Sequence, residues 1–188
     1  MIMENKTLYT ITVFSENMVG LLNQITIIFT RRRINIETLS VSPSAIEGIH
    51  KFTITAFSDP DTIVKVVKQI DKRVGIIKTY CNTDEGLVHQ EIALYKVATE
   101  SLMQLGSIED IVSRYNAQIL EMTEHFTVFS KTGHYADTQA MFRELSERVG
   151  VLQFIRSGRV AVTKERVELL NDMLAVMEER VKNDNLIE

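Results

Sequence analysis

The sequence predicts an α+β protein made of two ferredoxin-like βαββαβ domains and a C-terminal helix. Both halves of the chain show the same order of strand-like and helix-like segments. A polar stretch without periodicity, NTDEGLVH at 82–89, separates the halves. A strongly helical pattern begins at Lys164, after the second half. We therefore expect a first domain at 1–84, a second domain at 85–163 and a helical extension at 164–188.

The first half begins with Leu8–Phe14, which is rich in β-branched and aromatic residues and predicts a strand. The following segment places apolar residues such as Leu21, Ile25 and Ile28 on one helical face. A second helix has Asp59 as its N-cap and Pro60 in its first turn. We expect strands at 8–14, 34–42, 50–57 and 74–81 and helices at 19–32 and 60–72.

The second half repeats this order. Ile108, Ile111 and Tyr115 share one face of a predicted helix, as expected for a segment that packs on a sheet. We expect strands at 89–98, 117–123, 125–131 and 150–156 and helices at 104–115 and 135–148.

The C-terminal extension carries a narrow apolar seam typical of a coiled coil, formed by Val167, Leu170, Leu174, Met177 and Val181. A helix of about 18 residues is marginal alone, so we expect this seam to pack on the chain's own second domain, on a second copy or on a partner.

Composition indicates a compact globular chain and excludes several functional classes. The 188 residues carry 24% charged and 45% apolar side chains, and the net charge of −4 gives no general attraction to nucleic acid or acidic membrane. The one basic run, Arg31 to Arg33, falls at a helix C-terminus, where cations are favoured. Cys81 is the only cysteine, which favours a reducing compartment. No signal pattern or membrane-spanning run is visible, so we expect a cytoplasmic protein.

Catalytic chemistry is nearly absent from the sequence. The four histidines are widely spaced, unlike the close pairs of common zinc sites, and no dinucleotide fingerprint, P-loop or nucleophile elbow occurs. Adjacent carboxylates lie in the linker or on polar helix faces, and Glu37 is expected at a sheet rim. The segment HKFTITAF lacks the glycine–aromatic signature of RNA-recognition strands. We expect neither an enzyme, a metal protein nor a nucleic-acid-binding protein.

The segment ENMVGLL at 16–22 predicts a small-molecule site. It joins a strand to a helix, where the first turn leaves backbone N–H groups unpaired, and such groups can hold a carboxylate. Gly20 lets a ligand approach the backbone, and Asn17 adds an amide that both donates and accepts. The alternative is that Asn17 is a plain helix N-cap. The expected carboxylate donors are Val19, Gly20 and Leu21, and Asn35 offers a second amide from this chain or a neighbour.

At these residues the chain resembles a known family. A strand, ENxxGxL, a helix and then NIE[ST]L open the ACT domain in the small, regulatory subunits of acetohydroxyacid synthase (acetolactate synthase). The resemblance continues through HKFTITAFSDPDTI, HQEIALYKV and FIRSGRVAVTK, and thus over nearly the whole chain. One departure is Arg33, which replaces the glycine that usually closes the first helix. We therefore expect that helix to end without the usual left-handed glycine cap.

The resemblance implies a regulatory subunit that binds valine, leucine or isoleucine as a homodimer. It places Asn35 and Ile36 of the opposing subunit across the pocket. It also implies that the catalytic large subunit of acetolactate synthase carries the thiamine diphosphate, Mg²⁺ and FAD, with no cofactor in this chain. The alternative reading is a free-standing ACT-type regulator, for which the sequence shows no output domain.

The second domain is linked by the resemblance to contact with, and activation of, the catalytic subunit. The segment Arg156, Ser157, Gly158 and Arg159 ends a predicted strand and carries two guanidinium groups. These groups could bind carboxylates across an interface. The alternative is that they are solvated charges at a strand end.

Overall fold

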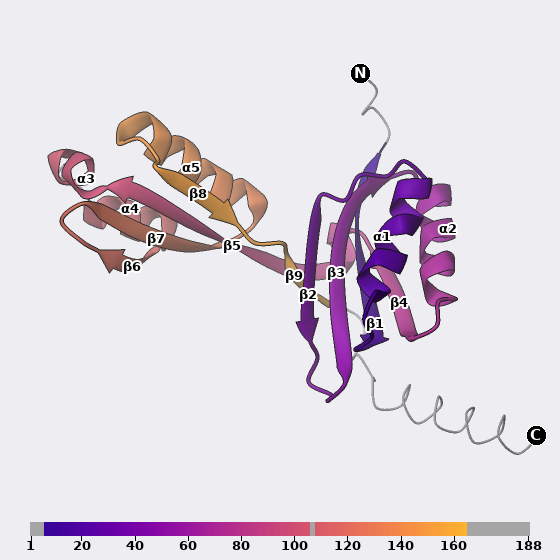
Figure 1. Cartoon of the computed structure of the whole chain (residues 1–188). Coiled ribbons are helices and arrows are strands. Elements are labelled where there is room, and N and C mark those ends of the chain that lie inside the picture. Colours follow the sequence, from indigo (N-terminus) through magenta and orange to yellow (C-terminus); the bar gives the residue numbers. More distant parts are fainter. Residues whose placement is uncertain (1–5, 106–107, 165–188) are drawn as a thin grey trace, which may run out of the picture. The chain divides into compact units, whose positions relative to one another are not determined.

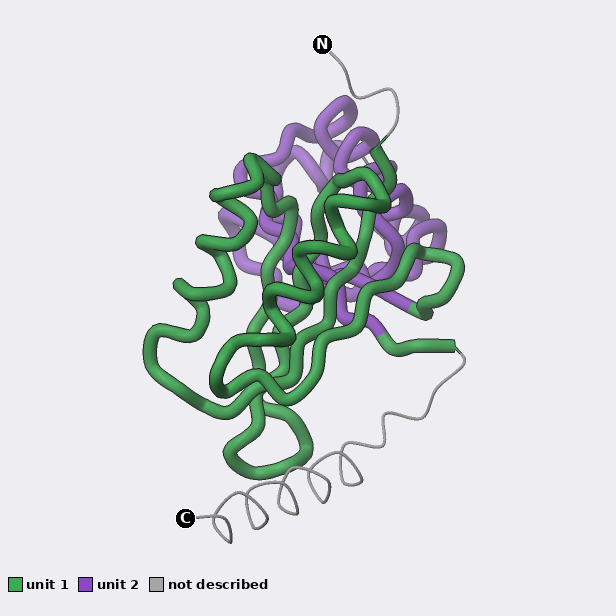
Figure 2. Tube along the Cα trace, turned by 90° about the vertical axis from the view of Figure 1, so that its right-hand side faces the viewer, with its two compact units in different colours: residues 1–88, 162–188 green, residues 89–161 purple. Residues whose placement is uncertain are grey.

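The computed structural model describes residues 6–105 and 108–164. These residues form two compact units, shown in green and purple in Figure 2. Unit 1 comprises the chain up to Val88 and again from Val162, and unit 2 comprises His89–Ala161. Each unit has its own core and is described by itself.

Unit 1 is a four-stranded antiparallel sheet in the order β2-β3-β1-β4, with both of its helices on one face (Figure 1). Its elements are β1 (Thr7–Glu16), α1 (Leu21–Arg31), β2 (Thr38–Pro43), β3 (Ile49–Ser58), α2 (Pro60–Asp71) and β4 (Ile76–Asn82). The predicted βαββαβ order is confirmed. Ile11 and Val13 of β1 alternate with Thr10 and Thr12, so the aliphatic pair faces the helices and joins the core.

The helices of unit 1 begin and end for identifiable reasons. At the start of α2, the Asp59 carboxylate accepts a hydrogen bond from the Thr62 N–H at 2.8 Å, as predicted. At the end of α1, Arg33 itself adopts the left-handed conformation with φ +54°. Arg33 N–H donates to the Thr30 carbonyl and Ile34 N–H to the Phe29 carbonyl, which forms a Schellman motif. The helix thus ends without a glycine, but the arginine in its place keeps the left-handed cap.

Unit 2 repeats the arrangement with the sheet order β6-β7-β5-β8, and β9 also pairs with β5. The elements from the linker onward are η1 (Asp84–Gly86), β5 (Leu87–Ala98), α3 (Thr99–Leu105), α4 (Ile108–Tyr115), β6 (Gln118–Met122), β7 (Phe126–Gly133), α5 (Tyr135–Arg148), β8 (Gln153–Arg156) and β9 (Val160–Thr163). Two helices stand where one was predicted at 104–115, and β9 is an additional strand. The predicted linker is largely η1 and the beginning of β5.

The core of unit 2 lies between its sheet and its helices. Tyr95, Phe129 and Met141 are fully buried there. The Tyr95 hydroxyl donates to the Thr138 carbonyl at 2.7 Å, so its polar end is satisfied. Burial raises the pKa of Tyr95 well above its ordinary value, which keeps the phenol neutral.

The division into units falls a few residues after the predicted boundary at Asp84, because Leu87 is buried and Val88 still belongs to unit 1. The functional assignment of the two domains stays a prediction. Apart from Lys164, the predicted C-terminal helix lies outside the described residues. No helix within residues 6–105 or 108–164 is long and apolar enough to cross a membrane.

Candidate functional site

The turn between β1 and α1 is held by backbone hydrogen bonds to two glycines. Glu16 N–H donates to the Gly75 carbonyl at 2.8 Å, and Asn17 N–H donates to the Gly48 carbonyl at 2.9 Å. Gly20 then takes the left-handed conformation with φ +84° immediately before the first helical residue. A glycine adopts this conformation without a steric penalty, which explains its place in the motif. The sequence reasoning missed Gly48 and Gly75, because both lie in distant loops.

The first turn of α1 leaves several backbone donors unused. In the described part of the chain, the N–H groups of Val19, Gly20, Leu22 and Asn23 form no hydrogen bond. The Leu21 N–H, one of the three predicted donors, makes a long bond of 3.4 Å to the Met18 carbonyl. Uncapped N–H groups at a helix N-terminus attract an anion through their partial positive charge. The turn thus has the chemistry of a carboxylate site.

The two asparagines predicted to line the site, Asn17 and Asn35, lie beyond opposite ends of α1. Asn17 is exposed, and its side-chain amide has no hydrogen bond in the described structure. The helix N-cap is Gly20, so the alternative of Asn17 as a plain N-cap is excluded. Asn35 is exposed beyond the other end of α1 and donates weakly to Glu37 Oε1 at 3.4 Å, whereas Ile36 packs on the core.

A single chain does not bring the two amides together. The 11 residues of α1 separate Asn17 from Asn35, and a helix of that length spans about 16 Å. A site that uses both therefore requires the second amide from another copy of the chain.

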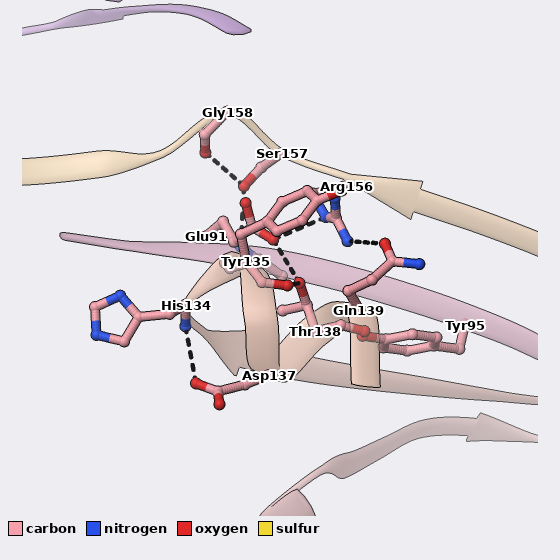
Figure 3. A network of polar contacts seen from close by, with 11 residues as sticks. Glu91, Tyr95, His134, Tyr135, Asp137, Thr138, Gln139, Arg156, Ser157 and Gly158 are labelled. Atoms are coloured by element: carbon pink, nitrogen blue, oxygen red, sulfur yellow. Dashed lines mark hydrogen bonds and ion pairs between the residues drawn. The ribbon is translucent and has the colours of Figure 1, made fainter. Parts of the chain in front are cut away.

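In unit 2, Arg156 is engaged within its own unit (Figure 3). Its Nε lies 2.7 Å from Glu91 Oε1 without the alignment of a hydrogen bond, so this contact is an ion pair. A second guanidinium nitrogen donates to Gln139 Oε1 at 3.0 Å, and the group stacks near the ring of Tyr135, 4.2 Å from its centroid. The side chain is only 17% exposed. The guanidinium is thus already engaged inside unit 2, and its contact with a partner stays a prediction.

Ser157 also makes internal contacts. Its N–H donates to the Ile92 carbonyl at 2.8 Å, and its Oγ accepts from the Ile92 N–H at 3.0 Å. The hydroxyl donates in turn to the Gly158 carbonyl. Gly158 and Arg159 follow in the short irregular segment between β8 and β9 and are half-buried. Because β8 and β9 both pair with β5, the segment Ser157–Arg159 continues along that strand.

Comparison with known proteins gives the family. A model described as "AHAS small subunit-like ACT domain" matches residues 11–78, and one described as "Small subunit of acetolactate synthase" matches residues 90–165. The chain belongs to the acetolactate synthase small-subunit family. Residues 11–78 of unit 1 accordingly form an ACT domain of the acetolactate synthase small-subunit type.

Individual relatives agree with this assignment. Acetolactate synthase small subunits of Mycobacterium bovis and Bacillus subtilis are each 28% identical, over 83% and 85% of this chain and 92% and 91% of their own lengths. A chloroplastic small subunit of Arabidopsis thaliana is also 28% identical, but the chain spans only 32% of its length. The crystal structure of the Thermotoga maritima small subunit superposes with a TM-score of 0.75 at 25% identity, covering 85% of this chain and 99% of that one.

A regulatory role in branched-chain amino acid biosynthesis follows from this family. The part of the chain that the structure describes contains no group of three or more side chains able to hold a metal ion.

Proposed function

We propose that this chain activates the catalytic subunit of acetolactate synthase and makes it sensitive to feedback inhibition by valine or another branched-chain amino acid. Binding of the amino-acid effector is supported by the turn at Gly20, with its unused N–H groups and the exposed amide of Asn17. The family supports the partner, because its members are named as small subunits of that enzyme.

The effector carboxylate binds the N–H groups of Val19 and Gly20 at the helix N-terminus. Asn17 orients the ammonium or the carboxylate, and a second chain supplies Asn35 and Ile36. Since one chain keeps the two asparagines at opposite ends of α1, the binding-competent form is a homodimer.

Inhibition acts by shifting a population of states rather than by blocking the substrate. An effector moves the catalytic subunit only as far as it binds one state better than the other, typically about five- to 150-fold. Thiamine diphosphate, Mg²⁺ and FAD belong to the catalytic subunit in this proposal, and unit 2 supplies the contact with that subunit.

The test compares two isosteric variants at one position. Any side chain at Gly20 is strained by the positive φ, but a β-carbon there meets no other atom within 4 Å. Gly20→Asn and Gly20→Asp therefore share the same strain and differ in one negative charge. We expect calorimetry to show that Gly20→Asp loses valine binding and Gly20→Asn retains part of it, because the new carboxylate repels that of the ligand. The holoenzyme reconstituted with Gly20→Asp should remain active and should not be inhibited by valine.

Equal valine affinity in the two Gly20 variants would remove this turn from the effector site. Failure of the wild-type chain to stimulate the catalytic subunit would contradict the proposed activation. An Asn35→Ala variant tests the second half of the site, since it should weaken binding while leaving the dimer intact.

A further inference from the structure

The ion pair between Glu91 and Arg156 lies where β5 and β8 meet the beginning of α5 (Figure 3). The Glu91 side chain is 9% exposed and also accepts a hydrogen bond from the Thr138 hydroxyl. Arg156 reaches Gln139 of α5 as well. The pair thus connects two strands and one helix through a single buried contact.

This contact lies directly beside the segment Ser157–Arg159, which links β8 to β9 along β5. Ile92 follows Glu91, Ser157 follows Arg156, and the neighbours exchange hydrogen bonds through the Ser157 N–H and Oγ. The Ser157 hydroxyl takes the place of a backbone carbonyl where the β5–β8 ladder ends. We expect the shape of the Ser157–Arg159 segment to depend on the buried pair next to it.

A buried ion pair adds little net stability, but it fixes the positions of the groups that form it. Removing one partner leaves an uncompensated charge, and the remaining side chain moves toward water. If Arg156 moves, the strand end moves with it. A guanidinium fixed by a carboxylate, an amide and an aromatic ring holds a narrower range of positions than an ammonium can.

We propose that Glu91 and Arg156 are positioning residues for the catalytic subunit, because their ion pair holds the Ser157–Arg159 segment in the form that this partner recognises. This inference rests on the proposed function. It replaces direct contact by Arg156 with an indirect role and assigns Glu91 a role that the sequence did not suggest. The catalytic subunit contacts residues 157–159 themselves. The ion pair holds these residues in place and does not touch the partner.

The experiment uses the full chain and three variants. Glu91→Gln and Arg156→Lys each disturb the pair. Arg148→Lys is the matched control, because Arg148 in the same unit forms an ion pair with Glu144 at the same 2.7 Å. Activity of the catalytic subunit is titrated against each form of the small subunit. Amide hydrogen exchange of residues 92 and 157–159 is measured on the small subunit alone.

For Glu91→Gln and Arg156→Lys we expect faster exchange in the Ser157–Arg159 segment. We also expect a rise of roughly three- to tenfold in the half-saturating concentration, since the segment must then be ordered on binding. Maximal stimulation should be unchanged, and Arg148→Lys should change neither quantity. A purely structural role would give faster exchange with an unchanged half-saturating concentration, which overturns the proposal. Unchanged exchange in both variants overturns it as well. Absence of stimulation by the wild-type chain would contradict the proposed function, whereas the exchange measurement still decides whether the pair holds the Ser157–Arg159 segment.

Discussion

The sulfur of Met18 lies 2.5 Å from the position that a β-carbon on Gly75 would occupy. Gly75 has φ +80°, and its carbonyl accepts the Glu16 N–H, so the loop before β4 and the turn before α1 hold each other. The side chain of Met18 fills the space that the glycine leaves. The loop at Gly75 thus supports the proposed effector site although it contributes no side chain.

Gly75→Ala should weaken amino-acid binding by roughly two- to tenfold, because its β-carbon displaces Met18 and loosens the neighbouring turn. Gly150→Ala is the control, since Gly150 of unit 2 has φ +75° but open space around its α-carbon. Both variants should lose about 1–2 kcal/mol of unfolding free energy through backbone strain. Urea unfolding and calorimetry measure the two effects. Equal affinities in both variants would show that the Met18 contact does not matter for binding.

Arg33→Gly should stabilise unit 1 by about 1 kcal/mol, because Arg33 holds φ +54° in the cap of α1 and glycine adopts that conformation freely. The measurement is the midpoint of urea unfolding at constant m-value. Asn116, with φ +48° after α4, provides the comparison. Asn116→Gly should give a smaller gain, since asparagine tolerates the left-handed region better than arginine does. A destabilised Arg33→Gly variant would indicate that the arginine side chain has a stabilising role of its own.

Glu144→Gln should destabilise unit 2 at neutral pH by about 1 kcal/mol, the scale of a half-exposed charge network. Glu144 accepts from the Tyr115 hydroxyl at 2.6 Å and pairs with Arg114 and Arg148. The Tyr115 hydrogen bond, followed by that from Arg148, lowers the pKa of Glu144 below its ordinary 4.5. A lowered folded pKa gives stability that is present above pH 4.5 and is lost as the pH falls through the folded value.

Unfolding free energies of wild type and Glu144→Gln should therefore converge as the pH is lowered from 7 toward 3. An exposed residue of the same helix supplies the control variant, Glu147→Gln, which should stay close to wild type throughout. A difference between wild type and Glu144→Gln that does not shrink with acid would refute the role of the carboxylate charge.

Alkylation of Cys81 should be slow in the native protein. Burial raises the pKa of this thiol to about 11 from an ordinary value of 9.0. A rise of two units lowers the reactive thiolate fraction near pH 8 by roughly a hundredfold. Iodoacetamide labelling, followed by mass spectrometry, should be faster by at least that factor in denaturant. Comparable rates in both conditions would mean that the β4 edge opens readily.

Local patterns sufficed for most of the fold. The predicted helix at 135–148 coincides with α5, because its apolar stripe and terminal residues are all local signals. The strand at Val160–Thr163 was missed, since four residues carry little periodicity and its pairing partner, β5, lies far back in the sequence. The prediction of a single helix at 104–115 was wrong, because this region contains the end of α3 and all of α4.

Of the candidate sites, the one built from neighbouring residues could be predicted from the sequence, and the one built from distant residues could not. The Gly20 turn was visible from sequence because a strand, a glycine and a helix follow one another within a few residues. The role of Arg156 was not visible, because its carboxylate partner Glu91 lies 65 positions earlier. A charged residue at a strand end looks the same in sequence whether it is solvated, bound to a partner or paired inside.

The last described residue closes a contact with the linker between the two halves. Lys164 N–H donates to the Gly86 carbonyl at 3.0 Å, and its Nζ donates to the Glu85 carbonyl at 2.8 Å. During synthesis the ribosome delivers these acceptors about 80 residues before their donor, which corresponds to roughly 4–16 seconds of translation. The sheet of unit 1 can form in that interval, whereas this closure waits until all of unit 2 has been made. A chain released early would keep both domains nearly whole and leave the two linker carbonyls without their donors.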